Sequence, residues 1–390
     1  MASKLEEILT ERLAGREARS QLRRLTTLPA DNVDFSSNAY LSLSVVPEIR
    51  RAYHSLVETH ASPPAFLGSG GSRLLDGNST LAEALERDIA AFHNAPAGLL
   101  FNSGFDANVG LVSCLPQSGD VVVYDELIHA SAHDGMKLSR AGDKVSFKHN
   151  CVEGEGGLDD VLQGFAEEKR SVFILAEGVY SMDGDVAPLA EIVACVKQRF
   201  PRGNAYIIID EAHSTGLYGK QGRGLVCELG LEADIFVRLH TFGKAMSSSG
   251  AIVLCSATTR EYLINYARTL IYTTAMPFPC LASIRVSYDF LDSGRADSLL
   301  DHLWSLVNHT HGLLLSLSSR QAVISVNQDV PKSPIIPVFT LHPRSLAQFC
   351  QQRGFTVRPI VAPTVPKGSE RVRTRAGYPQ TITREQSVEQ

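Results

Sequence analysis

The sequence lacks several features that would place it in a particular class of protein. Its 390 residues contain no apolar run long enough to span a bilayer. The N-terminal segment has neither the apolar core of a signal peptide nor the composition of a mitochondrial presequence, because it carries early acidic residues. The net charge of −5 gives no basis for binding nucleic acid or an anionic membrane surface. We therefore expect neither among its partners.

Disulfide bonds are not indicated either. The seven cysteines are odd in number and show no C-x-x-C spacing, which favours reduced thiols in an intracellular protein. The tripeptide Ser-Lys-Leu stands at residues 3–5 and not at the C-terminus, so it is no peroxisomal signal. We expect a cytoplasmic protein without a metal site; a peroxisomal location stays an alternative for which no C-terminal signal is present.

The composition is that of an ordinary globular protein, with 44% hydrophobic and 20% charged residues. Short apolar runs alternate with helical patterns, which predicts an α/β fold with a mostly parallel central sheet and helices on both faces. The expected strands are residues 98–104, 120–125, 171–178, 205–213, 235–240 and 251–256, and the expected helices between them include 79–93 and 189–200.

Three regions are expected along the chain. Residues 1–45 form an N-terminal helix and arm, because Leu5, Ile8, Leu9 and Leu13 recur at helical spacing. Residues 46–280 form a large domain. Residues 281–390 form a smaller C-terminal α/β domain, with expected strands at 333–341 and 354–361 and a helix at 345–354.

Polar side chains follow the expected strands. In a parallel sheet the carboxyl ends of the strands meet at one edge, and ligands bind there. The groups that come together in this way are Ser103 and Gly104, Asp125 and His129, Glu177 and Ser181, Asp210 and His213, and Thr241 and Lys244. Their convergence is a stronger signal than any single motif.

The stretch "LHTFGKAMSSSG" (239–250) places Lys244 among glycine and hydroxyl residues. A tight turn of this kind can bind an anion through backbone and hydroxyl donors. An exposed turn lysine is the plain alternative, and Asp210 alone could be a helix cap or an ion-pair partner. Together they form the set that pyridoxal phosphate needs. The lysine forms the Schiff base, the aspartate keeps the ring nitrogen protonated, and His213 can reach the edge of the same ring.

Longer motifs support this interpretation. They include "FNSGFDAN" (101–108), "EGVYSMDGD" (177–185), "IDEAHSTGLYGKQGRG" (209–224), "TFGKA" (241–245), "IYTTAMP" (271–277) and "PTVPKGSERVR" (363–373). In this order they resemble the α-oxoamine synthases among the fold-type I pyridoxal-phosphate transferases, and most closely the 8-amino-7-oxononanoate synthase branch. The resemblance covers residues 34 to 373.

The resemblance implies a role for each matching residue. Lys244 would carry the cofactor and act as the base, and Asp210 would pair with the ring nitrogen. His213 and Ser181 would contact the ring oxygen, and His129 would stack on the ring. The phosphate would be held by donors from Ser103, Gly104, Phe105 and Thr241. The pair Thr273 and Thr274 would reach the phosphate of a neighbouring subunit, which implies a homodimer with shared active sites.

The amino-acid carboxylate would be bound by Asn38 and Arg373, since arginine can form two parallel hydrogen bonds to a carboxylate. Arg23 and Arg24 match positions near the acyl-CoA, although two solvated charges ending a helix are an equal alternative. The arginine that relatives place shortly before "PTVP" is absent from its usual position, and the nearest one is Arg358.

The implied reaction is the decarboxylative condensation of an amino acid, with L-alanine favoured, and an acyl-CoA resembling pimeloyl-CoA. It yields an α-amino ketone, CoA and CO2, as in biotin biosynthesis. The alternatives are an oxoamine synthase with another amino acid or acyl donor, a glycine C-acetyltransferase, an aminotransferase or lyase of the same fold, and a non-catalytic subunit. The presence of Lys244 argues against the last.

The chain departs from the family pattern in two further places. Ala39 and Ser42 replace residues that are usual in the N-terminal motif. After residue 373 the sequence "TRAGYPQTITREQSVEQ" is polar, contains Pro379 and lacks helical apolar spacing. We therefore expect an atypical end of the small domain, with truncation as the alternative explanation.

Overall fold

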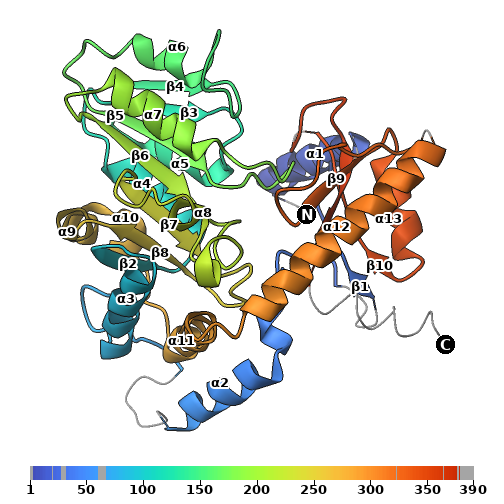
Figure 1. Ribbon diagram of the computed structural model, residues 1–390, viewed down its shortest axis with the longest axis horizontal. Coiled ribbons are helices and arrows are strands. Elements are labelled where there is room, and N and C mark those ends of the chain that lie inside the picture. The colour runs from blue at the N-terminus through green and yellow to red at the C-terminus, as the bar shows by residue number, and fades with distance from the viewer. Residues whose placement is uncertain are drawn as a thin grey trace.

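The centre of the protein is a seven-stranded sheet with the strand order β2-β8-β7-β6-β5-β3-β4 (Figure 1). The computed structural model describes residues 3–19, 21–27, 32–59, 67–321, 323–362, 364–375 and 377. The strands are β2 (Ala97–Phe101), β3 (Val121–Asp125), β4 (Asp143–Phe147), β5 (Val172–Glu177), β6 (Ala205–Asp210), β7 (Val237–Thr241) and β8 (Ala251–Cys255). Of these, β8 runs antiparallel to both its neighbours, and the other pairs are parallel. The predicted mostly parallel sheet is confirmed.

Helices cover both faces of this sheet. They are α2 (Pro47–Thr59), α3 (Thr80–Phe92), α4 (Gly104–Cys114), α5 (Ala130–Leu138), α6 (Leu158–Gln163), α7 (Leu189–Arg199), α8 (Leu225–Glu228), α9 (Ala257–Tyr266), α10 (Arg268–Ile271) and α11 (Phe278–Asp292), with 3-10 turns η1 (Leu43–Val45) and η2 (Lys220–Gly222). Because successive side chains of a strand point to opposite faces, Ile207 and Ile209 enter one apolar core with α3, α7 and α11. Ile208 enters a second core with α4, α5 and α9.

The local sequence explains several element boundaries. All six residues of β5 are buried, as expected for a parallel strand covered on both faces. Several helices begin with a serine cap, in which the side chain accepts a hydrogen bond from the backbone N–H three residues on. Ser79 caps α3 in this way and Ser103 caps α4. The cap on α4 matters for function, because it fixes the N-terminus of that helix beside the strand edge.

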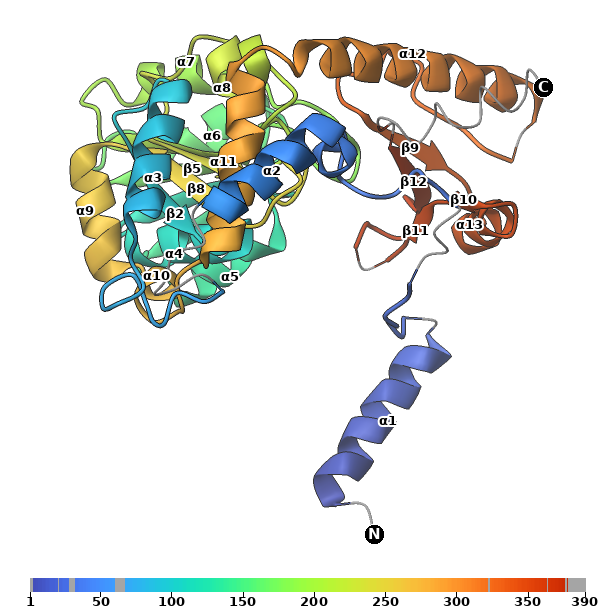
Figure 2. The same ribbon diagram turned by 90° about the horizontal axis from the view of Figure 1, so that it is seen from below.

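A smaller body lies at one end of the large one and is reached through the long helix α12 (Figure 2). Its elements are α12 (Asp297–Arg320), β9 (Ile335–Phe339), α13 (Pro343–Gln351), β10 (Phe355–Thr356), β11 (Arg358–Ile360) and β12 (Arg371–Arg375). The order β11-β12-β9 forms an antiparallel sheet, and β1 (Val33–Asp34) pairs with β10. The predicted C-terminal α/β body is confirmed. The domain boundaries after residues 45 and 280 remain predictions. Of the atypical segment after residue 373, Thr374 and Arg375 extend strand β12, and the residues from 376 on lie, apart from Gly377, outside the described residues.

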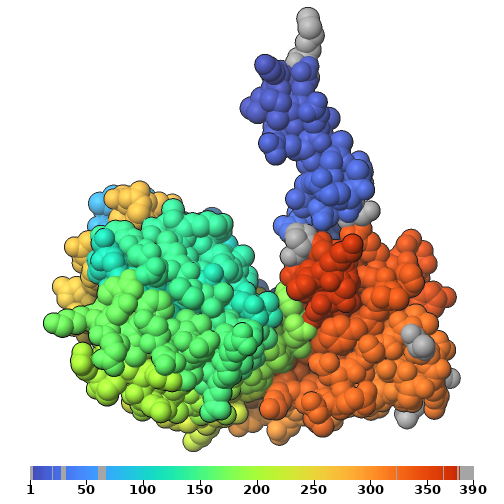
Figure 3. Space-filling view, turned by 90° about the horizontal axis from the view of Figure 1, so that it is seen from above, coloured from blue at the N-terminus to red at the C-terminus, as the bar shows by residue number. Residues whose placement is uncertain are grey.

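Several elements were not fully anticipated, among them strand β12, for which no strand was expected. Strand β4 was missed, because its sequence "DKVSF" has only one buried residue, Phe147, and pairs only with β3 at the sheet edge. The N-terminal helix α1 (Lys4–Ala18) was predicted correctly, but none of its residues is buried, and Leu5 and Leu9 are 62% and 50% exposed. Figure 3 shows α1 standing clear of both bodies. No helix within the described ranges is long and apolar enough to cross a membrane.

Candidate active site

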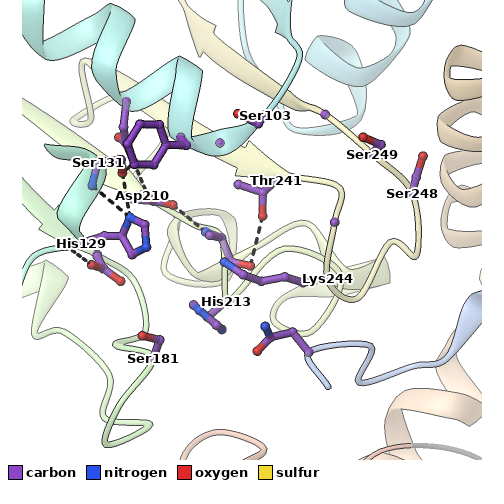
Figure 4. A pocket seen from close by; sticks show the side chains of 18 of the residues that line it. Ser103, His129, Ser131, Ser181, Asp210, His213, Thr241, Lys244, Ser248 and Ser249 are labelled. Atoms are coloured by element: carbon purple, nitrogen blue, oxygen red, sulfur yellow. Dashed lines mark hydrogen bonds between the residues drawn. The ribbon is translucent and has the colours of Figure 1, made fainter. Parts of the chain in front are cut away.

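A cavity of about 470 Å³ opens at the carboxyl edge of the central sheet (Figure 4). Its walls come from the ends of β5, β6 and β7, the N-terminus of α4 and strand β12 of the small body. The predicted site residues that line it are Asn38, Ser103, Gly104, Phe105, His129, Ser181, Asp210, His213, Thr241, Lys244 and Arg373. The structure thus brings together residues separated by more than 300 positions in the sequence.

Asp210 ends β6 at the floor of the cavity and is 9% exposed. Its Oδ1 accepts a hydrogen bond from the backbone N of Ala212 at 2.9 Å, and its Oδ2 accepts one from Asn108 Nδ2 at 2.7 Å. Both bonds fix the plane of the carboxylate. Among the described residues no lysine or arginine forms an ion pair with Asp210, so its buried carboxylate is available to a positively charged partner in the cavity.

His213 is held from the other side of the cavity. Its Nδ1 lies 2.7 Å from the hydroxyl of Tyr40, which is almost fully buried. Burial lowers the pKa of His213 well below its usual value, and nearby Lys244 lowers it further. Because burial raises the pKa of Tyr40 to about 12, a neutral phenol and a neutral imidazole share this hydrogen bond. In the tautomer in which the hydroxyl donates to Nδ1, the Nε2 of His213 is a hydrogen-bond donor.

His129 precedes α5, and two contacts orient it. Its backbone N donates to Glu177 Oε1 at 2.7 Å, and its Nδ1 lies 2.8 Å from the hydroxyl of Ser131. Burial lowers the pKa of His129, although Asp210 opposes the shift. Burial also raises the pKa of Glu177 well above its usual value, with a further contribution from Asp210. A neutral imidazole with an apolar face is therefore presented to the cavity.

Lys244 lies in the tight turn that follows β7 and points into the cavity near Thr241 and His213 (Figure 4). The turn is closed by backbone hydrogen bonds from Ser247 N to Lys244 O at 2.9 Å and from Ser248 N to Phe242 O at 2.8 Å. Burial lowers the pKa of the Lys244 amine, while Asp210 and Glu177 oppose the shift. A larger neutral fraction of the amine makes it a better nucleophile and base.

The N-terminus of α4 supplies an anion cradle. Ser103 caps the helix, and the next two backbone N–H groups have no partner within it, which is the arrangement that binds phosphate in many proteins. A Cβ atom added at Gly104 would stand 2.4 Å from Thr241 Cγ2. Only glycine allows this close approach, which brings the Thr241 methyl against the helix terminus, while the Thr241 hydroxyl donates to the carbonyl oxygen of Ala212 at 3.5 Å.

The loop that carries Ser181 is clamped from two sides. On one side His149 donates from Nδ1 to Asp125 Oδ1 at 2.8 Å and from Nε2 to Asp185. On the other side Arg371 forms an ion pair with Asp183. Burial alone would lower the pKa of His149, but the hydrogen bonds to the two carboxylates outweigh it and raise this pKa to about 10.

This clamp predicts a pH dependence of stability. Because the pKa of His149 rises from 6.5 to about 10 on folding, its contribution is complete below pH 6.5 and is lost as the pH rises through about 10. We expect the difference in free energy of unfolding between the wild type and His149→Gln to shrink between these limits. Denaturant titrations of both proteins at several pH values measure it. A difference that stays constant over the window contradicts the charged clamp.

Some predicted residues lie outside the cavity of this chain. Thr273 and Thr274 follow α10 in a turn, where Asn102 Nδ2 donates to Thr273 Oγ1 at 3.1 Å and to Thr274 O at 2.7 Å. Arg24 pairs with Glu17, and Arg358 donates to Thr26 Oγ1 at 3.2 Å. Neither these residues nor Arg23 line the cavity.

Several lining residues were not assigned from the sequence. They include Asn102, Asn108, Ser131, Met182 and Arg375. Asn108 is four residues after Gly104 and so lies one helical turn further along α4, while Arg375 is two residues after Arg373 and so shares its strand face. Those two spacings are the sequence signals from which Asn108 and Arg375 could have been assigned to the site.

The cavity fits pyridoxal phosphate. It has an anion cradle at one end, the buried carboxylate of Asp210 at the floor and a lysine of lowered pKa between them. Asn38 Oδ1 is buried without a hydrogen-bond partner among the described residues, and it too lines the cavity. Such an unsatisfied atom indicates a ligand that completes the site.

Comparison with known proteins agrees with this geometry. The family model for aminotransferase class I and II matches residues 30–384. The 8-amino-7-oxononanoate synthase of Emericella nidulans is 53% identical over 376 residues, covering 95% of this chain and 90% of that protein. The aminoacyl transferase sphA of Aspergillus fumigatus is 38% identical over 388 residues, covering 95% of this chain and 82% of that protein.

Solved structures are similar over the same length. A serine palmitoyltransferase from S. paucimobilis with a bound PLP–myriocin aldimine has a TM-score of 0.84 at 25% identity, covering 99% of this chain and 96% of that one. An 8-amino-7-oxononanoate synthase from Francisella tularensis has a TM-score of 0.70 at 26% identity, covering 93% and 97%. The chain therefore belongs to the aminotransferase class I and II family, as a pyridoxal-phosphate-dependent acyltransferase of the α-oxoamine synthase type.

Proposed function

We propose that the protein condenses L-alanine with an acyl-CoA resembling pimeloyl-CoA, releasing CoA and CO2 and forming an α-amino ketone. The observation that carries this proposal is the cavity that unites Lys244, Asp210, His213 and His129 with an anion cradle. The 53% identity to an 8-amino-7-oxononanoate synthase supports the choice of substrates.

The cofactor would be held by the residues that the cavity presents. Asp210 would face the ring nitrogen, His213 and Ser181 the ring oxygen and His129 the ring face. The phosphate would bind the cradle of Ser103, Gly104, Phe105 and Thr241. When bound, pyridoxal phosphate supplies an electron sink for the carbanion formed at the amino-acid Cα.

The protein's own groups would then move the protons. Lys244 Nζ takes the α-proton of the amino acid, and its lowered pKa makes the neutral amine available for this. After acyl transfer and loss of CO2, the same ammonium returns a proton to the carbon. Asn38 and Arg373 would hold the substrate carboxylate. His129 could donate to the thioester oxygen as negative charge develops on it.

A second candidate uses another amino acid or acyl donor. The similarity of the chain to an aminoacyl transferase and to serine palmitoyltransferases supports this second candidate. Mass spectrometry of products, after incubation with glycine, alanine or serine and acyl-CoAs of different length, separates the two. We expect the alanine and pimeloyl-CoA product to dominate; preferential use of serine with a long acyl chain would contradict the primary proposal.

We also propose a homodimer in which each active site uses both chains. Thr273 and Thr274 lie outside the cavity of their own chain, which is compatible with a role in the partner's phosphate site. Mixing inactive Lys244→Ala chains with inactive Thr273→Ala/Thr274→Ala chains should restore activity. About half of the dimers are then hybrids with one intact site, so about a quarter of wild-type activity is expected.

The mixing experiment has two controls. Subunit exchange must be verified with differently tagged chains, and each variant must be assayed alone. Activity that stays at the level of the separate variants after exchange contradicts shared sites. A double threonine variant that is fully active by itself favours the alternative that those hydroxyls only satisfy local contacts such as the Asn102 bond.

A further inference from the structure

Strand β12 carries three arginines on one face, and they differ in their partners. Arg371 forms an ion pair with Asp183. Arg373 donates to the carbonyl oxygen of Ser181 at 2.8 Å, and Arg375 donates to the carbonyl oxygen of Ser36. Among the described residues, no carboxylate lies within ion-pair distance of Arg373 or Arg375.

Arg375 is the more unusual of the two. It is only 3% exposed, its Nε has no hydrogen-bond partner among the described residues, and it lines the cavity. A buried guanidinium that lacks both a counter-ion and one of its hydrogen bonds is costly. Such a group is stable in the working enzyme if a ligand anion completes it.

The charges around Arg375 do not supply that anion. Tyr40 faces it, but burial raises the pKa of this phenol to about 12, so it is neutral near pH 7. Asp34 raises the pKa of Arg375 through space but forms no ion pair with it among the described residues; its Oδ1 accepts hydrogen bonds from the backbone N–H groups of Ser36 and Ser37 at 2.7 and 3.0 Å. The neighbour with the same sign, Arg373, has its pKa lowered to about 10 by burial and by Arg375. Two cations thus share one wall of the cavity.

We propose that Arg375 is a second carboxylate-binding residue of the active site, acting beside Arg373 on a carboxylate of the substrate. The inference rests on the proposed function, which brings carboxylates from two sources. One is the α-carboxylate of the amino acid, and the other is a terminal carboxylate on the acyl donor. Arginine suits both because its fork can bind a carboxylate through two parallel hydrogen bonds.

The test compares charged ligands with neutral counterparts in the holoenzyme. Dissociation constants for glycine, L-alanine and L-serine, and for their amides, are measured from the visible absorption of the bound cofactor. KM is measured for pimeloyl-CoA and for heptanoyl-CoA, which has the same length without the terminal carboxylate. The dissociation constants and the KM values are determined for the wild type, for Arg375→Gln and for Arg353→Gln. Arg353 is an exposed arginine of the small body that does not line the cavity.

We expect Arg375→Gln to weaken the binding of at least one ligand that carries a carboxylate by about tenfold or more, which is the effect of losing a charge-assisted hydrogen bond. Binding of the neutral counterpart of that ligand should be almost unaffected. The control variant Arg353→Gln should change the binding of neither the charged nor the neutral ligand. Weaker binding of the amino acids but not of their amides shows that Arg375 binds the α-carboxylate. A higher KM for pimeloyl-CoA but not for heptanoyl-CoA shows that it binds the terminal carboxylate of the acyl donor. Equal changes for charged and neutral ligands, or no change, overturn the proposal and leave Arg375 with a structural role.

A conservative variant covers the case in which Arg375→Gln does not fold. Arg375→Lys keeps the charge but loses the two-nitrogen fork, so the affinity ratio of charged to neutral ligand should fall by a few fold. An unchanged ratio in this variant also overturns the inference. Failure of the proposed function would look different, because the wild type itself would then not bind L-alanine or use pimeloyl-CoA.

Discussion

Replacing Lys244 by alanine is expected to reduce turnover by several orders of magnitude while leaving the fold intact. The amine is both the attachment point of the cofactor and the base that moves the α-proton, so one substitution removes two functions. The side chain points into a cavity and forms no ion pair within the described residues, so its removal should cost little packing. The visible absorption of lysine-bound pyridoxal phosphate should disappear together with the activity.

Two further variants make this result specific. Lys244→Arg keeps a positive charge but cannot form a Schiff base, and it should be as inactive as the alanine variant. Lys137→Ala removes an exposed lysine that pairs only with Asp134 on the surface of α5, and it should behave as the wild type. Thermal unfolding of all three checks that they fold. Wild-type turnover by Lys244→Ala would exclude this lysine from the chemistry.

The fold was predictable because its signals are local. Buried parallel strands such as β5 and β6 are continuous apolar runs, and every expected strand of the central sheet is present. Strand β4 lacked this signal because it lies at the edge, where most of its side chains face solvent. The helical spacing of α1 was likewise visible, but no local pattern indicated that its apolar side chains would remain exposed.

The site was predictable where a polar residue stands at or shortly after the end of a strand, as Asp210 and Lys244 do. It was not predictable where the support comes from a distant segment. Tyr40 meets His213 across 173 positions, and Asn108 meets Asp210 across 102 positions. Such pairs follow from the crossing of helices and strands in space, and no spacing in the sequence encodes them. Arg375 illustrates a third case, because its spacing from Arg373 was visible but its burial without a partner was not.

Replacing Asp210 by asparagine is expected to lower the rate of α-proton removal by about a hundredfold or more, on the scale of losing one preorganised electrostatic contact in an active site. The substitution keeps the size of the side chain but removes the charge that would stabilise a protonated ring nitrogen. It also changes local hydrogen bonding. Asn108 now donates to Asp210 Oδ2, and an asparagine amide at that position would oppose a second amide donor unless one of the two side chains flips.

The loss of charge and the loss of that hydrogen bond can be separated. Asn108→Ala removes the bond but leaves the carboxylate, which keeps the bond from Ala212 N at 2.9 Å, so this variant should lose only about tenfold, the size of one hydrogen bond to a charged group. The measurement is exchange of the alanine α-proton with deuterated solvent, followed by NMR without acyl-CoA, so acyl transfer does not contribute. Cofactor retention after gel filtration is recorded for each variant. If Asp210→Asn exchanged the proton at the wild-type rate with the cofactor retained, the carboxylate would not be what stabilises the carbanion, and its burial at the cavity floor would have to be explained by structure alone.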